Sequence, residues 1–152
     1  MAVTSTGEVF GSGVNDDGQV LHDRPDSQLS HPVLVESLLS QRVIQASCGE
    51  NHTACLTASG AVIAWGCNEV GQLGHSKDLV TKVAPRSVMG LSGKVIKQVS
   101  CGYLFTLLLS SDGEVYSCGM GGSTGHADWE NRWKAERIDQ LRFVPVGESS
   151  LS

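Results

Sequence analysis

Short apolar runs, each ended by glycine or by a polar turn, follow one another along most of this chain. The clearest runs lie at residues 43–47, 52–57 and 61–65, and again at 95–100, 105–110 and 114–118. Asp112-Gly113 between two such runs is a strong hairpin signal, because both residues tolerate the positive φ of a tight turn. Ser37–Ser40 is too short to support a helix. The pattern therefore predicts antiparallel strands.

The runs recur with a fixed period. Gly7, Gly60 and Gly113 lie 53 residues apart (60 − 7 and 113 − 60), and the residues after each of them align without gaps. The same spacing relates further positions, among them Cys48 and Cys101, Gly49 and Gly102, and Gly66 and Gly119. A period near 50 residues is typical of a propeller or another repeat array. We predict an all-β array of antiparallel four-stranded sheets stacked around an axis.

The middle copy resembles the repeat of the regulator of chromosome condensation family. It reads Gly60-x-Val62-x-x-Trp65-Gly66-x-Asn68-x-x-Gly71-Gln72-Leu73-Gly74, preceded by Cys48-Gly49-x-x-His52-Thr53. The resemblance extends from Met1 to about Pro145 and implies a propeller of about seven blades. This chain would supply about 2.5–3 of those blades. The outer copies diverge, since the third lacks the Gln-Leu pair and has Phe105 in place of the histidine.

The repeat also predicts the domain organisation. The approximate units are 1–42, 43–95 and 96–146, followed by a disordered tail at 147–152. Met1 aligns with Ala54, inside a strand, and Phe143–Gly147 falls where the next strand would start, although Pro145 disfavours a central strand there. A short arc of blades leaves a sheet edge and an apolar flank open, which favours association. We expect a fragment or short form of a longer propeller protein, or self-association if the chain is complete as given.

Composition limits the partners. The formal net charge is −5, so the bulk surface offers no electrostatic basis for binding nucleic acid. The chain has no apolar run long enough to span a membrane. Its first residues lack the charged start and apolar core of a signal peptide. These features predict a protein of the cytoplasm or nucleus with reduced thiols.

Candidate catalytic and metal-binding residues fit structural roles better. The five cysteines include no C-x-x-C pair, so we expect no metal site, and Cys48 and Cys101 are predicted to be small buried strand-end residues. His22, His75 and His126 recur after the glycine loop and are expected to bind their own loops. No phosphate-binding loop or catalytic triad stands out, so we expect that the protein binds no cofactor and is not an enzyme. The predicted structural repeat positions are Gly60, Trp65, Gly66, Gly71, Gly74, Cys48, Gly49, His52, Cys101, Gly102, Gly113 and Gly119.

One connector departs from the repeat. It contains Trp129, Arg132, Trp133 and Arg137, whereas the second connector has no aromatic residue. Tryptophan and arginine dominate interface hot spots, so these four residues are the candidate partner-binding residues. A helical turn would place the two tryptophans on one face. The alternative is that both rings cover the flank of the third blade.

Three functions remain open from the sequence. The first is a non-catalytic protein–protein interaction platform whose specificity comes from connectors such as 76–83 and 128–137. The family resemblance also implies guanine-nucleotide exchange on a small GTPase of the Ran type. A third possibility is a light sensor like the plant ultraviolet-B receptor. Its Gly-Trp-Arg-His-Thr pattern reads Gly49-Glu50-Asn51-His52-Thr53 here, without the tryptophan, so we do not favour it.

Overall fold

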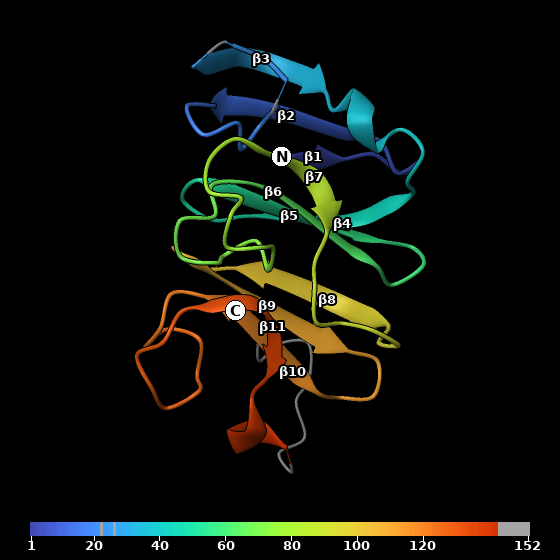
Figure 1. The fold of residues 1–152 in the computed structure, drawn as a ribbon. Coiled ribbons are helices and arrows are strands. Elements are labelled where there is room, and N and C mark those ends of the chain that lie inside the picture. Colours follow the sequence, from blue (N-terminus) through green and yellow to red (C-terminus); the bar gives the residue numbers. More distant parts are fainter. Residues whose placement is uncertain (22, 26, 143–152) are drawn as a thin grey trace.

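Three antiparallel sheets, which we call blades, stack in chain order along the molecule (Figure 1). The computed structural model describes residues 1–21, 23–25 and 27–142. The first blade consists of β1 (Ala2–Val3), β2 (Val9–Val14) and β3 (Gln28–Leu34). The second consists of β4 (Val43–Cys48), β5 (His52–Thr57), β6 (Val62–Gly66) and β7 (Val83–Ser87). The third consists of β8 (Ile96–Cys101), β9 (Phe105–Ser110), β10 (Val115–Gly119) and β11 (Arg132–Arg137).

The strand register repeats with the sequence period. Leu56 pairs with Val62 in the second blade, and the residues 53 positions later, Leu109 and Val115, pair in the third. In the first blade, Val3 pairs with Val9, which again lies 53 residues before the second-blade pair. β1 is therefore the counterpart of β5, as the alignment of Met1 with a strand residue predicted. The all-β, partial-propeller prediction is confirmed, although the described first blade has three strands rather than four.

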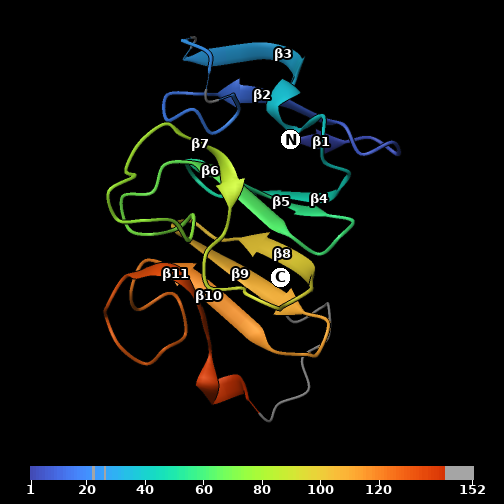
Figure 2. The same cartoon turned by 45° about the vertical axis from the view of Figure 1, so that its right-hand side comes forward.

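Two single turns of 3₁₀-helix are present, η1 (Glu36–Leu38) and η2 (Asp139–Leu141). η1 lies between β3 and β4, where the chain passes from the first blade to the second, and η2 follows β11. The predicted tail at 147–152, together with Pro145 and His22, lies outside the described residues. Figure 2, turned by 45°, shows the same three sheets one above another, with the long loops that lead into β7 and β11 on the left.

The backbone conformation favours glycine at both hairpin turns, and at Gly60 the next blade leaves no room for a side chain. Gly60 has φ of +84°, and Gly113, one period later, has φ of +86°. This left-handed backbone strains any residue with a β-carbon. A β-carbon on residue 60 would also lie 2.5 Å from Val95 Cγ1 and 3.2 Å from the backbone nitrogen of Ile96 in the next blade. At Gly113 the described residues place nothing within 4 Å of that position.

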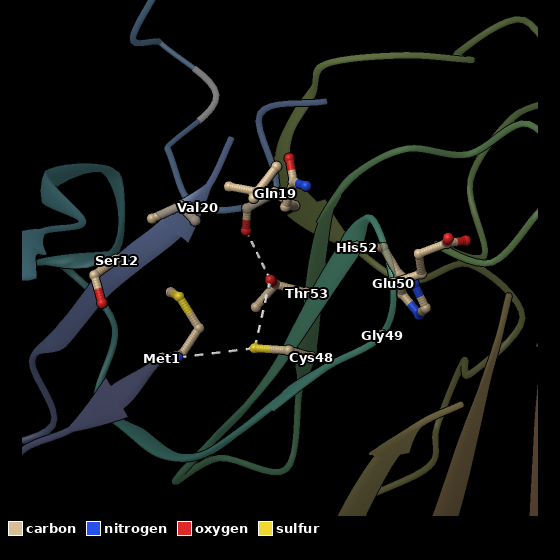
Figure 3. Close-up of a pocket in the computed structure, with 10 residues that line it drawn as sticks. Met1, Ser12, Gln19, Val20, Cys48, Gly49, Glu50, His52 and Thr53 are labelled. Carbon is tan, nitrogen blue, oxygen red and sulfur yellow. Dashed lines mark hydrogen bonds between the residues drawn. The ribbon is translucent and has the colours of Figure 1, made fainter. Parts of the chain in front are cut away.

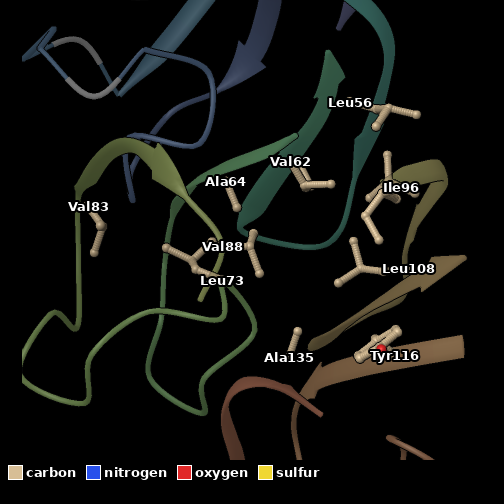
Figure 4. Close-up of a cluster of buried hydrophobic side chains, with 12 residues drawn as sticks. Leu56, Val62, Ala64, Leu73, Val83, Val88, Ile96, Leu108, Tyr116 and Ala135 are labelled. Carbon is tan, nitrogen blue, oxygen red and sulfur yellow. The ribbon is translucent and has the colours of Figure 1, made fainter. Parts of the chain in front are cut away.

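The hydrophobic core lies between the blades. One cluster fills the seam between the second and third blades (Figure 4) and includes Leu56, Ala64, Leu73, Ile96, Val99 and Leu108. Another fills the seam between the first and second blades around Trp65, which is fully buried with Val9, Val20 and Leu38. Neighbouring sheets that pack face to face through their apolar side chains are the arrangement expected of a propeller.

Polar side chains also join the second blade to the third. The Gln45 amide on β4 donates to the Val99 carbonyl (2.8 Å) and accepts from the Val99 N–H (3.0 Å) on β8. The Cys101 N–H donates to Ser47 Oγ at 2.9 Å. His52 Nε2 lies 3.0 Å from Thr106 Oγ1. The second blade is thus fixed to the third by hydrogen bonds as well as by apolar packing.

Candidate protein-binding surface

The connector between β10 and β11, residues 120–131, forms a braced loop that we call the Trp129 loop. The Gly122 N–H donates to the Asp128 carbonyl at 3.0 Å, and the Gly121 N–H donates to Asn131 Oδ1 at 2.9 Å. Trp129 projects from this loop with 88% of its surface exposed. A β-carbon on residue 122 would lie 2.6 Å from Trp129 Cζ3, so glycine there lets the ring lie against the loop. The loop therefore presents a large exposed aromatic ring on a hydrogen-bonded support.

A hollow of about 470 Å³ lies beside this ring. Gly122, Gly125, Ala127, Asp128 and Trp129 line it. Ala127 has φ of +60°, a left-handed backbone that is uncommon outside glycine. Such strain persists only where the surroundings impose it, and it often marks functional sites. A large exposed ring next to a concave surface is a suitable contact for a partner side chain.

Arg132, the first residue of β11, holds the Trp129 loop through an ion pair and a hydrogen bond. Its Nη2 lies 2.6 Å from Asp128 Oδ2, its Nη1 donates to the Glu130 carbonyl at 2.9 Å, and its Nε lies 3.0 Å from Glu136 Oε2. The side chain is only 12% exposed. The hydrogen bond from Arg132 holds the pKa of Asp128 below its usual range. Arg132 is thus placed to position Trp129, and its guanidinium is already engaged within the chain.

Arg137 belongs to a separate charged cluster on the third blade. Its Nη1 lies 2.9 Å from Glu114 Oε1 and its Nη2 lies 2.9 Å from Asp139 Oδ1. Lys94 pairs with Glu114 and, at 2.8 Å, with Asp112. Hydrogen bonds from Lys94 first, then from Tyr116 and Arg137, lower the pKa of Glu114 to about 2. The groove beside this cluster has a volume of about 480 Å³. Four of the charged residues that line it, Lys94, Glu114, Arg137 and Asp139, are already paired with one another.

Trp133 does not share a helical face with Trp129. It lies within β11, where Lys77 Nζ stands 5.8 Å from the centroid of its ring. Trp129 lies in the loop before β11, with its ring against Gly122. The helical-turn interpretation is wrong because the chain is extended from Arg132 onward. The alternative that both rings cover the blade flank is also wrong for Trp129, because its ring is exposed.

The repeat histidine and cysteine residues in the seams are poorly suited to acid–base or nucleophilic chemistry. Burial lowers the pKa of His52 to about 4, although a hydrogen bond with the Phe105 backbone opposes the shift. Burial raises the pKa of Cys55 to about 12 and that of Cys101 to about 11. At neutral pH these histidine and thiol groups are uncharged. Among the described residues, no group of three or more His, Cys, Asp or Glu side chains could hold a metal ion.

Seven of the eight predicted structural glycines, all except Gly113, lie where blades and loops approach closely. An added β-carbon would come closer than 3 Å to a neighbouring atom at Gly49, Gly60, Gly66, Gly71, Gly74, Gly102 and Gly119. His75 Nε2 lies 3.0 Å from the Ala64 carbonyl, and His126 Nε2 lies 2.9 Å from Ser117 Oγ. Both histidines therefore bond to a neighbouring strand of their own blade.

One cysteine prediction is wrong. Cys48 is exposed and Cys101 is half-buried, whereas both were expected to be buried. Cys101 donates from its Sγ to the Ser47 carbonyl at 3.3 Å, because β4 covers it in the seam. Cys48 is the counterpart residue on β4, and it faces a hollow beside the first blade.

That hollow, about 260 Å³ in volume, lies between the first two blades, and we call it the β1 hollow (Figure 3). It is lined by Met1, Ser12, Val14, Gln19, Val20, Cys48, Gly49, Glu50, His52 and Thr53. Thr53 Oγ1 donates to the Gln19 carbonyl at 2.7 Å across it. No motif in the sequence indicated this hollow, because it depends on how the first two blades meet.

A second contact that sequence reasoning missed joins two equivalent loops. Tyr103 Oη donates to Glu50 Oε1, and the Glu50 N–H donates to the Tyr103 carbonyl at 3.2 Å. These residues are 53 positions apart, so the repeat period could have indicated the pair. Tyr103 is 62% exposed and is the second large aromatic ring on the described surface.

Together, the repeated strand register and the apolar packing between neighbouring blades define a partial β-propeller built from a 53-residue repeat. Sequence profiles described as the regulator of chromosome condensation (RCC1) repeat match residues 6–56 and 59–109, and a second profile of that description matches 43–72 and 96–123. The chain belongs to the RCC1 repeat family.

Curated relatives match over most of this chain but only over part of their own length. Mouse "Probable E3 ubiquitin-protein ligase HERC4" is 41% identical over 123 residues, which is 80% of this chain and 11% of that protein. Mouse "Protein RCC2" is 33% identical over 149 residues, which is 95% of this chain and 28% of that protein. The chain thus spans 11% of the length of one of these relatives and 28% of the length of the other.

Solved structures show the same fold. Human WBSCR16 superposes with a TM-score of 0.81 and 26% identity, covering 90% of this chain and 36% of that one. Prp20p from Saccharomyces cerevisiae superposes with a TM-score of 0.73 and 20% identity, covering 90% of this chain and 35% of that one. Within the described residues, no helix is long and apolar enough to cross a membrane.

Proposed function

We propose that this chain is a non-catalytic platform for protein–protein interaction, and that the Trp129 loop is its contact point. The observation that carries the proposal is the 88% exposure of Trp129 on a loop braced by Arg132. Exposing a tryptophan to water is unfavourable, and such rings are enriched at the centres of protein interfaces.

The surrounding structure supports a rigid platform. The blades are joined by apolar seams and by the Gln45, Ser47 and His52 hydrogen bonds, so the loop would present one shape to a partner. A preformed contact surface reduces the entropy that is lost on binding. Arg132 enters the proposal as a residue that holds the Trp129 loop, because its guanidinium group bonds to Asp128 and to the Glu130 carbonyl. Arg137, which pairs with Glu114 in the separate cluster, is not part of the proposed contact.

The test is a comparison of two exposed aromatic residues. Full-length protein and the Trp129→Ala and Tyr103→Ala variants are used as bait in quantitative affinity enrichment, after circular dichroism confirms that the variants fold. The proposal predicts a partner whose recovery falls at least tenfold with Trp129→Ala and stays within twofold with Tyr103→Ala, since interface hot-spot tryptophans are worth about 2 kcal/mol or more. Partners that respond equally to both variants, or to neither, would contradict it.

The second candidate function is guanine-nucleotide exchange on a small GTPase of the Ran type, or a part of that activity. It is favoured by the family and by a structural neighbour: the published description of Prp20p names binding to Gsp1p and histones, and another describes yeast RCC1 (Prp20) bound to Kap60. Release of a fluorescent nucleotide from a panel of small GTPases is the test. Faster release with this chain would replace the non-catalytic proposal.

Three further expectations stay proposals. We place the protein in the cytoplasm or nucleus, assign its repeat units to residues 1–42, 43–95 and 96–146, and expect open blade flanks to favour self-association. Sedimentation velocity at several concentrations tests the last of these, because self-association raises the mean sedimentation coefficient with concentration.

A further inference from the structure

One end of the second and third blades is formed by the turns before β5 and β9 and by the long connectors that lead into β7 and β11. The Cys67 N–H donates to the Asn51 carbonyl at 2.8 Å, and the Met120 N–H donates to the Leu104 carbonyl at 2.9 Å, so each connector starts beside the turn of its own blade. Figure 2 shows both connectors on the same side of the molecule. We call this surface the connector end, and it consists of residues 49–51, 67–82, 102–104 and 120–131.

The connector end carries an excess of negative charge. It has five carboxylates and two lysines, a net charge of −3 (2 − 5). The rest of residues 43–142 has seven Lys and Arg residues and four Asp and Glu residues, a net charge of +3 (7 − 4). These two blades are therefore neutral as a whole, with their negative charge concentrated at the end that carries Trp129. Such a surface attracts a positively charged partner. The charged residues of the connector end are Glu50, Glu69, Lys77, Asp78, Lys82, Asp128 and Glu130.

Trp129 stands between two of these carboxylates in the chain. Asp128 precedes it and is paired with Arg132, whose side chain is only 12% exposed. Glu130 follows it and is exposed, and within the described part of the chain its carboxylate forms no ion pair. Consecutive Cα atoms are about 3.8 Å apart, so the Trp129 ring and the Glu130 carboxylate are both within reach of one long side chain.

The exposure of Trp129 does not require an open blade flank. The second connector supplies the comparison, because the third blade lies next to it. Counted from the histidine after the glycine loop (75 and 126), Trp129 corresponds to Asp78, and counted back from the first residue of the following strand (83 and 132) it corresponds to Val80. Both of these residues are exposed.

The same end of the molecule already holds one cation over a tryptophan. Lys77 Nζ lies 5.8 Å from the centroid of the Trp133 ring, which is half-buried. Indole attracts a cation more strongly than the other aromatic side chains do. Among the described residues this is the one pair of its kind, so no cation of the chain itself covers the Trp129 ring.

We propose that the Trp129 loop binds an arginine side chain in a short basic segment of its partner. The guanidinium lies over the Trp129 ring and faces the Glu130 carboxylate, and the stem of the arginine lies in the hollow beside the ring, which Gly122, Gly125 and Ala127 line. Arginine fits better than lysine because its planar, weakly hydrated guanidinium stacks on an aromatic ring. This inference rests on the proposed function and names the chemistry of the partner.

The probe is a synthetic peptide, acetyl-GGRGRGG-amide, titrated into the full chain while the indole N–H signals are followed by ¹⁵N NMR. The peptide should shift the Trp129 signal in a saturable manner and leave that of the buried Trp65 unchanged. Replacing both arginines of the peptide with leucine should weaken binding about fivefold, because the cation–ring and charge contacts are lost. Equal binding of the arginine and leucine peptides, or no binding of either, would overturn the proposal.

Protein variants locate the bound arginine. Glu130→Gln should weaken binding about threefold, whereas Glu36→Gln, which removes the same charge from an exposed position in η1, should leave it unchanged. Trp129→Leu should weaken binding about fivefold, and Tyr103→Leu should have no effect. Loss of binding with Tyr103→Leu but not with Trp129→Leu would place the arginine on the other exposed ring and overturn the assignment.

The same variants separate this inference from the proposed function. A protein partner that depends on Trp129, but is neither weakened by Glu130→Gln nor displaced by the arginine peptide, would overturn the inference and leave the interaction platform standing. The absence of any partner that depends on Trp129 would contradict the proposed function itself, and this inference with it.

Discussion

Replacing His52 with phenylalanine should make the protein less sensitive to mild acid. His52 is almost fully buried in the seam, with its Nε2 3.0 Å from Thr106 Oγ1, and burial lowers its pKa from 6.5 to about 4. Phenylalanine is a suitable replacement because Phe105 occupies the same position in the third blade, with its ring over Gly102 as the His52 ring lies over Gly49.

The size of the effect follows from the two pKa values. Between pH 6.5 and about 4 the unfolded chain binds a proton at His52 that the folded chain does not, so stability is present above this range and is lost as the pH falls through it. Lowering the pH from 7 to 5 should cost about 2 kcal/mol through this residue, at about 1.4 kcal/mol per pH unit. For a chain of this size that is about 4–8 °C in Tm.

The assay is urea unfolding followed by circular dichroism at pH 7 and pH 5. His52→Phe loses its hydrogen bond at both pH values, so the informative quantity is the difference between them. It should be about 2 kcal/mol smaller than in the parent protein. His31→Phe, at an exposed position on β3, should leave the parent difference unchanged. An unchanged pH dependence in His52→Phe would refute the reasoning that His52 is held neutral by burial.

Three other predictions use pairs of positions or the thiols. Gln45→Ala should lower the free energy of unfolding by about 2 kcal/mol in urea titrations, because it breaks both hydrogen bonds to the next blade, whereas Gln98→Ala should cost far less. Gly60→Ala should lower Tm more than Gly113→Ala: both glycines have positive φ, but only at residue 60 does the new methyl group meet the next blade, so equal costs would contradict the seam geometry. In the folded protein at pH 7.5, Cys48 should react with a maleimide much faster than the other four cysteines, as read by peptide mass spectrometry, and rapid labelling of all five would contradict the burial pattern.

The repeat allowed most of the fold to be predicted from the sequence. The Gly60 turn, the strands on either side of it and their counterparts one period away follow from spacing alone, since each copy constrains the others. The register of β1 against β2 also followed, because Met1 aligned with a strand residue of the second copy.

The surface features could not be predicted in the same way. The Trp129 connector departs from the repeat, so no other copy indicates its conformation, and a four-residue spacing suggested a helical turn where the chain enters β11. The exposure of Cys48 depends on the neighbouring blade rather than on its own sequence. The pairing of Arg132 with Asp128 and Glu136 likewise arises from how the loop folds over β11.

The most direct measurement of the interaction role is photocross-linking from the Trp129 loop in cells. A photoreactive phenylalanine analogue is placed at residue 129 or, as the comparison, at Tyr103, and cross-linked products are identified by mass spectrometry. The structure predicts a discrete adduct from position 129 that is absent from position 103. Absence of any adduct from position 129, or the same products from both positions, would contradict the account of the Trp129 loop as the contact surface.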